Sequence, residues 1–227
     1  MSVDTSTAIL ERRSIRRYKP DQVPDDLLRE ILAEARWAPS AVNTQSTFVY
    51  ALSGEPLQKF KAELRGCAES EAKPNPDILP GDVPPEHATR RQDLFKARTT
   101  FVAAEEAKMG IKPPDEPINP MVAGAAIFEA PTVLVLTFDA SMSEGYGCFD
   151  AGLFTMCIAL SAHARGLGTC ITSSNVRFPD LLRKVIPGAE KQKIVAAIAL
   201  GYPDWEMPVN RFPRARIPVD DFLTFVR

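Results

Sequence analysis

The run PTVLVLTF, residues 131–138, decides the fold, because it is continuously apolar and has the length of a strand buried in the centre of a sheet. A second run of this kind, IVAAIAL at residues 194–200, ends at Gly201-Tyr202-Pro203. Between the two, residues 149–164 are almost wholly apolar and predict a helix that is buried on all sides or packed against another subunit. These runs predict a central sheet covered by a helix.

Helical and strand patterns alternate in the first half of the chain. The strongest helix is predicted over residues 24–37, because proline suits a first turn and apolar residues recur along one face. The other expected elements are a short helix over 5–12, a strand over 47–52, a helix over 56–64 and a polar helix over 86–109.

Two proline-rich stretches, residues 73–85 and 113–120, bracket an insertion at about 67–120 within a single domain, residues 1–227. Fixed proline backbone angles indicate an ordered excursion or a lid over a site, although the prolines are equally compatible with ordinary loops. The tail from about residue 211 to 227 carries Phe212, Phe222 and Phe225 but is too short to bury them. We therefore expect a C-terminal arm that lies on another subunit.

Composition limits the setting of the protein. The 227 residues are 45% hydrophobic and 25% charged, which is typical of a soluble globular protein. A net charge of −2 argues against general nucleic-acid binding. No stretch approaches the ~20 apolar residues of a membrane span, and the polar start MSVDTSTAILERR is not a signal peptide. We expect a cytoplasmic protein that binds neither nucleic acid nor membranes.

The cysteines and histidines offer little chemistry. The four cysteines form no CxxC pair and have no ligand-like spacing with the two histidines, so we expect no metal site and reduced thiols. There is no nucleophile elbow, and neither histidine has an acidic partner in the sequence. The sequence therefore gives little support to a Ser-His-Asp or Cys-His catalytic centre.

Arginine is concentrated near the start of the chain, in the run ERRSIRRY at residues 11–18. Guanidinium groups match phosphate oxygens in a bidentate geometry, and Ser14 adds a hydroxyl donor. A second basic pair, Arg214 and Arg216, lies near the other end. If folding joins the two ends, they form a cradle for one phosphate. The alternative is a set of surface charges neutralised by Glu11, Asp21 and Asp25, and these residues alone leave both interpretations open.

Two further segments could contact a ligand. WAPSAVNTQ, residues 37–45, offers small residues, hydroxyls and an amide after a helix, and Asn43 can donate and accept at the edge of a flat heterocycle. GLGTCITSS, residues 166–174, predicts a turn after the buried helix with backbone amides that could reach a ligand. The pattern GxGxxG is absent and the segment follows a helix, so a Rossmann site is excluded.

Five motifs in this order resemble those of the FMN-dependent nitroreductase family. They are RRSIR, APSAxNxQ, a buried helix ending in GLGTC, the strand IALGYP, and a terminal basic-x-basic followed by proline. The resemblance implies an α+β sandwich with a central mixed sheet flanked by helices. It also implies an intertwined homodimer with two FMN sites at the interface.

The resemblance assigns cofactor-binding roles to three groups of residues. The phosphate and ribityl side falls to Arg12, Arg13, Ser14, Arg16, Arg214 and Arg216. The other subunit would bring Pro39, Ser40 and Asn43 to the flavin. The isoalloxazine would lie along Ile171, Thr172, Ser173 and Ser174, with a backbone amide near Ser173 donating to N5. Asp150 stands where a relative has glutamine, and Ala41 and Ser46 depart from the usual Ser-Ser-x-Asn-x-Gln-Pro.

The resemblance also implies a function that needs no acid–base triad. Hydride passes from NADH or NADPH to flavin N5 and then, in a ping-pong order, to a nitroaromatic or quinone acceptor on the same face. Arg16 would stabilise the electron-rich edge of the reduced flavin. The alternatives are a specialised relative, such as a reductive dehalogenase or a flavin-fragmenting enzyme, and a flavin-binding protein without turnover.

Overall fold

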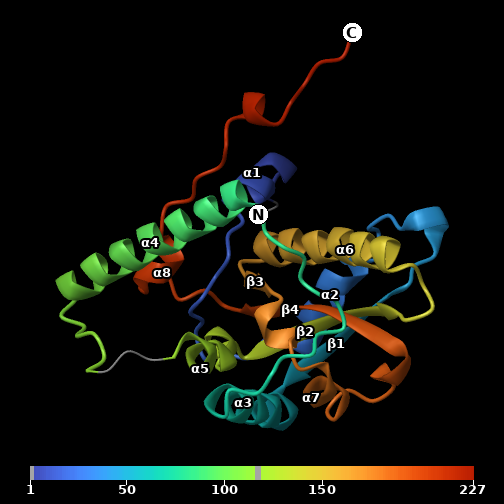
Figure 1. Cartoon of the computed structure of the whole chain (residues 1–227), viewed down its shortest axis with the longest axis horizontal. Coiled ribbons are helices and arrows are strands. Elements are labelled where there is room, and N and C mark those ends of the chain that lie inside the picture. Colours follow the sequence, from blue (N-terminus) through green and yellow to red (C-terminus); the bar gives the residue numbers. More distant parts are fainter. Residues whose placement is uncertain (1–2, 116–118) are drawn as a thin grey trace.

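The computed structural model describes residues 3–115 and 119–227, and its centre is a four-stranded sheet (Figure 1). The strands lie in the order β1-β2-β4-β3. Each neighbouring pair is antiparallel. The bounds are Thr47–Ser53 for β1, Thr132–Asp139 for β2, Gly168–Thr172 for β3 and Gln192–Gly201 for β4. The two apolar runs of the sequence are thus the two central strands.

The sheet differs from the predicted mixed sheet. The α+β class is confirmed, but the four strands are all antiparallel, and parallel pairing within the described residues is limited to an isolated bridge between Ser14 and Thr169. Residues 168–172, predicted as a turn, form the edge strand β3. An apolar run indicates burial of a strand but not its direction, and the polar, glycine-containing β3 has too weak a pattern to be recognised as a strand.

Helices cover both faces of the sheet, and alternate strand residues supply the two cores. On one face, Leu134 and Leu136 of β2 pack with α2 (Asp25–Ala35) and α6 (Glu144–Ala164). On the other face, Val133 and Val135 pack with α3 (Gly54–Glu69), α5 (Pro120–Ala125) and α7 (Pro179–Arg183). Because side chains of a strand alternate between its faces, one apolar run serves both layers.

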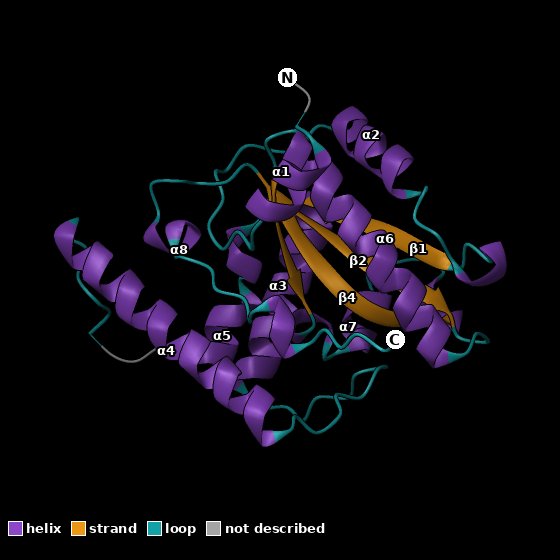
Figure 2. Cartoon of the chain, turned by 90° about the horizontal axis from the view of Figure 1, so that it is seen from above, coloured by secondary structure: helices purple, strands orange, loops and turns teal. Residues whose placement is uncertain are grey.

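The helix α6 begins before its predicted start. It lies across the strands of the sheet (Figure 2). By length and composition alone it could cross a membrane, but its buried residues pack on the sheet and α2, as in the core helix of a soluble protein. Tyr146 and Phe149 are 62% and 65% exposed, so the helix is not buried on all sides within one chain. Of the two arrangements predicted for this helix, packing against another subunit is the one that stays a prediction.

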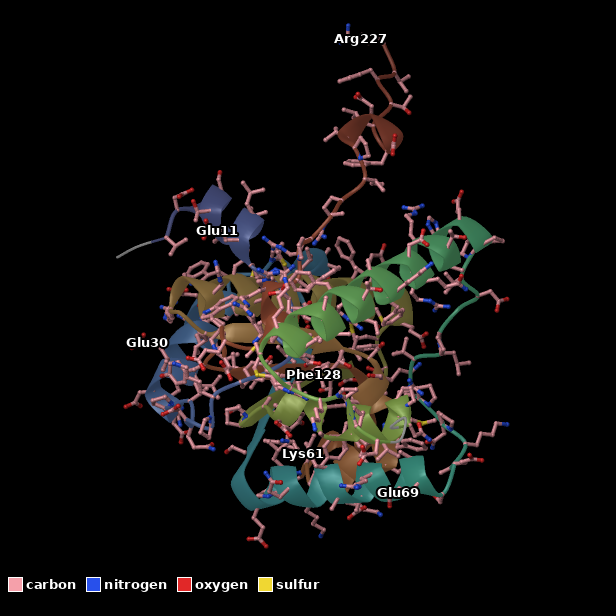
Figure 3. The ribbon with its side chains drawn as sticks, turned by 90° about the vertical axis from the view of Figure 1, so that its left-hand side faces the viewer. Glu11, Glu30, Lys61, Glu69, Phe128 and Arg227 are labelled. Atoms are coloured by element: carbon pink, nitrogen blue, oxygen red, sulfur yellow. The ribbon has the colours of Figure 1, made fainter. Side chains whose placement is uncertain are left out.

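The insertion contains α4 (Pro85–Lys108), which buries none of its residues and lies along one side of the molecule (Figures 1 and 3). The proline-rich stretch before it is tied to the body, because the Asp77 carboxylate accepts hydrogen bonds from Ile194 N at 2.8 Å and from Arg183 Nη2 at 2.6 Å. The second stretch includes Pro117, which lies outside the described residues. A lid function stays a prediction.

Segments close to the two ends of the chain are hydrogen-bonded to each other, through Arg12 and Arg16 near the start and Asn210 and Arg214 near the end. The short helices α1 (Thr5–Glu11) and α8 (Pro208–Arg211) belong to these ends. After α8 the chain runs away from the body, with one 3-10 turn at Val219–Asp221 (Figure 1). Phe222 and Phe225 in this arm are 67% and 70% exposed. Further 3-10 turns lie at Ala41–Asn43, Ile127–Glu129, Ser174–Val176 and Ala189–Lys191.

Candidate functional site

The strand β3 positions the N-terminal arginine segment. The backbone N–H of Ile15 donates to the Thr169 carbonyl at 2.9 Å, next to the parallel bridge between Ser14 and Thr169. Ile15 is buried in the core. Since successive side chains of an extended segment point to opposite sides, Ser14 and Arg16 are turned away from the core. The burial of Ile15 thus sets the direction in which the neighbouring side chains of Ser14 and Arg16 point.

Asn210 joins this segment to the chain before the C-terminal arm. Its side chain is fully buried, and its carbonyl oxygen accepts from the backbone N–H of Arg16 at 2.7 Å. Its amide nitrogen donates to the carbonyls of Arg17 and Asp204, both at 2.7 Å. No local pattern in the sequence marks this residue, because an isolated asparagine gives no signal of a contact 194 positions away.

The two basic segments lie side by side. The Arg214 guanidinium donates to the carbonyl of Arg12 and, at 2.7 Å, to that of Leu10. The Arg13 guanidinium donates to the carbonyl of Phe212 and lies 6.0 Å from the ring centre of Trp205. Folding therefore brings the two chain ends together, which is the condition that a shared cradle requires.

The segments enclose a cavity of about 200 Å³, which we call the arginine cavity. It is lined by Arg12, Arg13, Ser14, Arg16, Leu94, Arg98, Val209, Phe212, Arg214, Ala215 and Arg216. All six predicted phosphate-side residues are among them. Arg98 and Leu94 of α4 were not predicted, because that helix matches no family motif and its polar pattern indicates only a solvated surface.

The arginine cavity carries uncompensated positive charge. Within residues 3–115 and 119–227, no ion pair involves any arginine of the cavity, so neutralisation by Glu11, Asp21 and Asp25 does not occur. Burial lowers the pKa of Arg12, and the neighbouring charges of Arg214 and Arg216 lower it further. Among the described residues, the ion pairs that the surface-charge alternative requires are therefore absent, which favours the phosphate cradle.

One polar atom of the cavity points to an anionic ligand. Arg12 Nε is buried and has no hydrogen-bond partner among the described residues. Leaving a buried donor unsatisfied costs about 1–3 kcal/mol, and more when the group is charged. Guanidinium and hydroxyl donors without acidic partners match the oxygens of a phosphate group. The residues present thus fit a phosphorylated ligand.

The same strand leads from the arginine cavity to the second predicted segment. Beyond the exposed Ile171, the hydroxyl of the buried Thr172 donates to Asn175 Oδ1 at 2.9 Å and lies 2.8 Å from the hydroxyl of Ser174. Asn175 Nδ2 donates to the carbonyl of Gly124 at 2.8 Å. This network fixes the turn after β3, where Ser173 and Ser174 are exposed.

The segment after α2 forms a strained turn. Val42, Asn43 and Gln45 have φ angles of 44°, 59° and 51°, which non-glycine residues seldom adopt and which are often found at functional sites. The Ser40 hydroxyl accepts from Gln45 N at 2.9 Å. The buried Asp150 carboxylate accepts from Ala41 N at 3.2 Å, so Asp150 supports this turn.

This turn lies apart from the arginine cavity within one chain. It borders a separate cavity of about 220 Å³, whose lining shares no residue with the arginine cavity. That lining consists of Arg36, Ala38, Pro39, Ser40, Gln45, Thr47, Asp150 and Phe154. A single chain therefore pairs the arginine run with the start of β3 at Thr169, whereas Ile171, Thr172, Ser173 and Ser174 do not line the arginine cavity. The segment that was predicted to come from the other subunit lies at the separate cavity.

The fold and the arginine cavity together define an α+β protein with a cluster of arginine side chains, beside the edge of its sheet, that fits a phosphorylated ligand. The sequence pattern of the Nitroreductase family matches residues 9–202, and the chain belongs to this family. The predicted family is thus confirmed. The match spans the N-terminal arginine run, the sheet and the β3 segment, but it ends before Arg214 and Arg216.

Named relatives lie within the same family. The chain is 32% identical to 4-nitrobenzoate reductase from Pseudomonas putida over 219 residues, or 93% of this chain and 91% of the relative. It is 29% identical to chloronitrobenzene nitroreductase from Comamonas testosteroni, over 96% of this chain and 95% of the relative. The fold matches the FMN-dependent nitroreductase NfnB from Mycobacterium smegmatis, solved with NADPH, with a TM-score of 0.82 at 24% identity, covering 98% and 97% of the chains.

Proposed function

We propose that this protein is an NAD(P)H-dependent FMN nitroreductase. The arginine cavity carries the proposal, because its unpaired guanidinium groups and the buried Arg12 Nε fit the phosphate of FMN. When bound, FMN would supply the redox chemistry, taking hydride from NADH or NADPH at N5 and passing it on to the acceptor in a ping-pong order. The named relatives reduce nitrobenzoate and chloronitrobenzene, which supports a small nitroaromatic acceptor; a quinone is a second acceptor class.

The residues of the chain divide the binding of the cofactor among them. The arginines and Ser14 hold the phosphate and ribityl side. Arg16, at the end of this group, offsets the negative charge of the reduced flavin. Ile171, Thr172, Ser173 and Ser174 lie along the isoalloxazine, because β3 runs from the arginine cavity to their turn.

We further propose a cytoplasmic homodimer with FMN at its interface. The C-terminal arm and α6 expose apolar side chains to solvent, and contact with a second copy of the chain would bury them. The strained turn with Pro39, Ser40 and Asn43 then reaches the flavin of the partner subunit, which accounts for its distance from the arginine cavity. All four cysteines are free thiols, as suits a reducing compartment.

The function is tested by loading the purified protein with FMN and following oxidation of NADH and of NADPH. The acceptors are 4-nitrobenzoate, a quinone and a halophenol, each compared with no acceptor. Acceptor-dependent turnover with 4-nitrobenzoate or the quinone supports the proposal. Turnover with the halophenol alone would indicate a specialised dehalogenase, and an FMN-loaded protein without turnover would be a flavin-binding protein.

A further inference from the structure

Arg98 is a charged residue of the insertion that reaches the arginine cavity. It lies in the middle of α4, is half-buried, and lines the cavity together with Leu94 one helical turn earlier. Its neighbours Ala97 and Thr99 are exposed. The helix therefore directs one arginine side chain inward, toward a cavity that is also lined by five other arginine residues.

The placement of Arg98 is unfavourable without an anion. No ion pair or hydrogen bond from its guanidinium occurs among the described residues, although the group stacks over the ring of Phe95 at 5.0 Å. Burial lowers the pKa of Arg98, and the charge of Arg16 lowers it further. Like charges gathered in a partly buried site repel one another unless an anion compensates them.

The helix α4 has few other attachments to the body. It buries none of its residues, and it contacts α8 (Figure 1). Phe101 packs edge-on against Phe212, with ring centres 5.6 Å apart. A helix without a buried apolar face gains little from packing, so an additional contact at Arg98 would matter for its docking.

We propose that Arg98 is a ligand of the FMN phosphate and that the bound phosphate holds α4 against the body of the protein. This inference rests on the proposed function. By this proposal the insertion is part of the cofactor site. Guanidinium groups from the N-terminal segment, from the C-terminal basic pair and from α4 all bind the same phosphate.

The first test compares the affinities of FMN and riboflavin, which differ by the phosphate, in the wild type, Arg98→Gln and Lys96→Gln. Lys96 is exposed on α4 and does not line the cavity, so its variant controls for the loss of one charge from the helix. Loss of one charged hydrogen bond predicts that Arg98→Gln weakens FMN about tenfold to hundredfold and leaves riboflavin nearly unchanged. Lys96→Gln should change neither affinity by more than about twofold.

The second test follows hydrogen exchange of α4 with FMN, with riboflavin and with inorganic phosphate. FMN should protect the helix in the wild type and in Lys96→Gln, but not in Arg98→Gln, and riboflavin should not protect it. Protection by inorganic phosphate at millimolar concentration would show that the anion alone suffices for docking.

The outcomes separate the two proposals. If the wild type prefers FMN to riboflavin and Arg98→Gln keeps the same preference, the inference about Arg98 is overturned while the proposed function stands. Equal protection of α4 by FMN and riboflavin would overturn the docking role of the phosphate. A wild type that binds neither flavin removes the proposed function itself.

Discussion

Ile15 and Thr169 are joined by a backbone hydrogen bond of 2.9 Å, and this bond places the arginine run on the edge of β3. The two residues are more than 150 positions apart in the sequence. Ile15 is buried, whereas its neighbours Ser14 and Arg16 line the arginine cavity. The position of the arginine cavity therefore depends on the packing of one apolar side chain against the sheet.

Replacing Gly168 should displace the arginine run. A Cβ at this position would lie 2.5 Å from Ile15 Cγ1 and 2.9 Å from Pro203 Cγ, so Gly168→Ala forces Ile15 outward. We expect the free energy of unfolding in urea to fall by about 1–3 kcal/mol, and FMN binding to weaken with it.

The matched control for that variant is Gly66→Ala. Gly66 lies in α3, and a Cβ there would meet no atom within 4 Å, so the change should stabilise the protein by about 0.5–1 kcal/mol through helix propensity. A Gly168→Ala protein as stable as the wild type, with the same FMN affinity, would show that close packing at β3 does not set the position of the run.

Removing the side chain of Asn210 should loosen both chain ends. Asn210→Ala leaves Arg16 N and the Asp204 carbonyl without their partner in a partly buried site, whereas the Arg17 carbonyl still accepts from Asp204 N at 3.2 Å. Each unsatisfied group costs about 1–3 kcal/mol, so we expect a loss of at least about 2 kcal/mol in urea denaturation. A loss below about 0.5 kcal/mol would mean that these groups are hydrated in solution and that the bridge is not structural.

Much of the fold follows from local patterns in the sequence. The runs at 131–138 and 194–200 became the central strands because continuous apolar sequence of that length is compatible with burial on both faces. The helix α2 followed from its apolar face. The arginines of the two chain ends were identified by their density and residue type, which reflect the chemistry of phosphate binding.

The remainder depends on tertiary contacts that no local pattern records. β3 is a strand because it pairs with β4 and with Ser14, not because of its own glycine-containing sequence. Arg98 joins the arginine cavity through the placement of a helix that has no buried face. Direction in the sheet is likewise a property of the connections, and the mixed sheet that the family resemblance implied is antiparallel among its four strands in this chain.

The ion pair between α2 and α6 predicts a pH dependence of stability. The Arg165 guanidinium donates to both Glu34 carboxylate oxygens, and with Ser161 it lowers the pKa of Glu34 from 4.5 to about 2. Because the pKa of the folded state is depressed, the contribution is present above about pH 4.5 and is lost as the pH falls toward 2. Glu34 is 56% exposed, so the effect should be about 0.2–1 kcal/mol.

The measurement for this pair compares urea denaturation of the wild type and Glu34→Gln between pH 7 and pH 2. The difference between them should be constant above pH 5 and shrink below pH 4.5. Glu30→Gln is the control, since Glu30 lies 3.5 Å from Arg165 Nε and forms a weaker contact. A difference that does not change with pH would assign the effect to packing rather than to charge.

Truncation of the C-terminal arm tests the proposed dimer. Deleting residues 217–227 removes Phe222, Phe225 and Val226, which are exposed in one chain, and keeps Arg214 and Arg216. We expect the full chain to sediment as a dimer and the truncated chain to dissociate at micromolar concentration, with an unchanged circular dichroism spectrum. A full chain that sediments as a monomer would contradict the interface, and an equally stable truncated dimer would remove the arm from it.

The central claim is that the arginine cavity binds the phosphate of FMN. Its most direct test is the ratio of the dissociation constants for riboflavin and FMN in the wild-type protein, measured by titration calorimetry at fixed low salt. Several charge-assisted hydrogen bonds to phosphate, each contributing about 1.5–3 kcal/mol, predict that FMN binds at least about a hundredfold more tightly than riboflavin. Equal affinity for the two flavins would contradict the account.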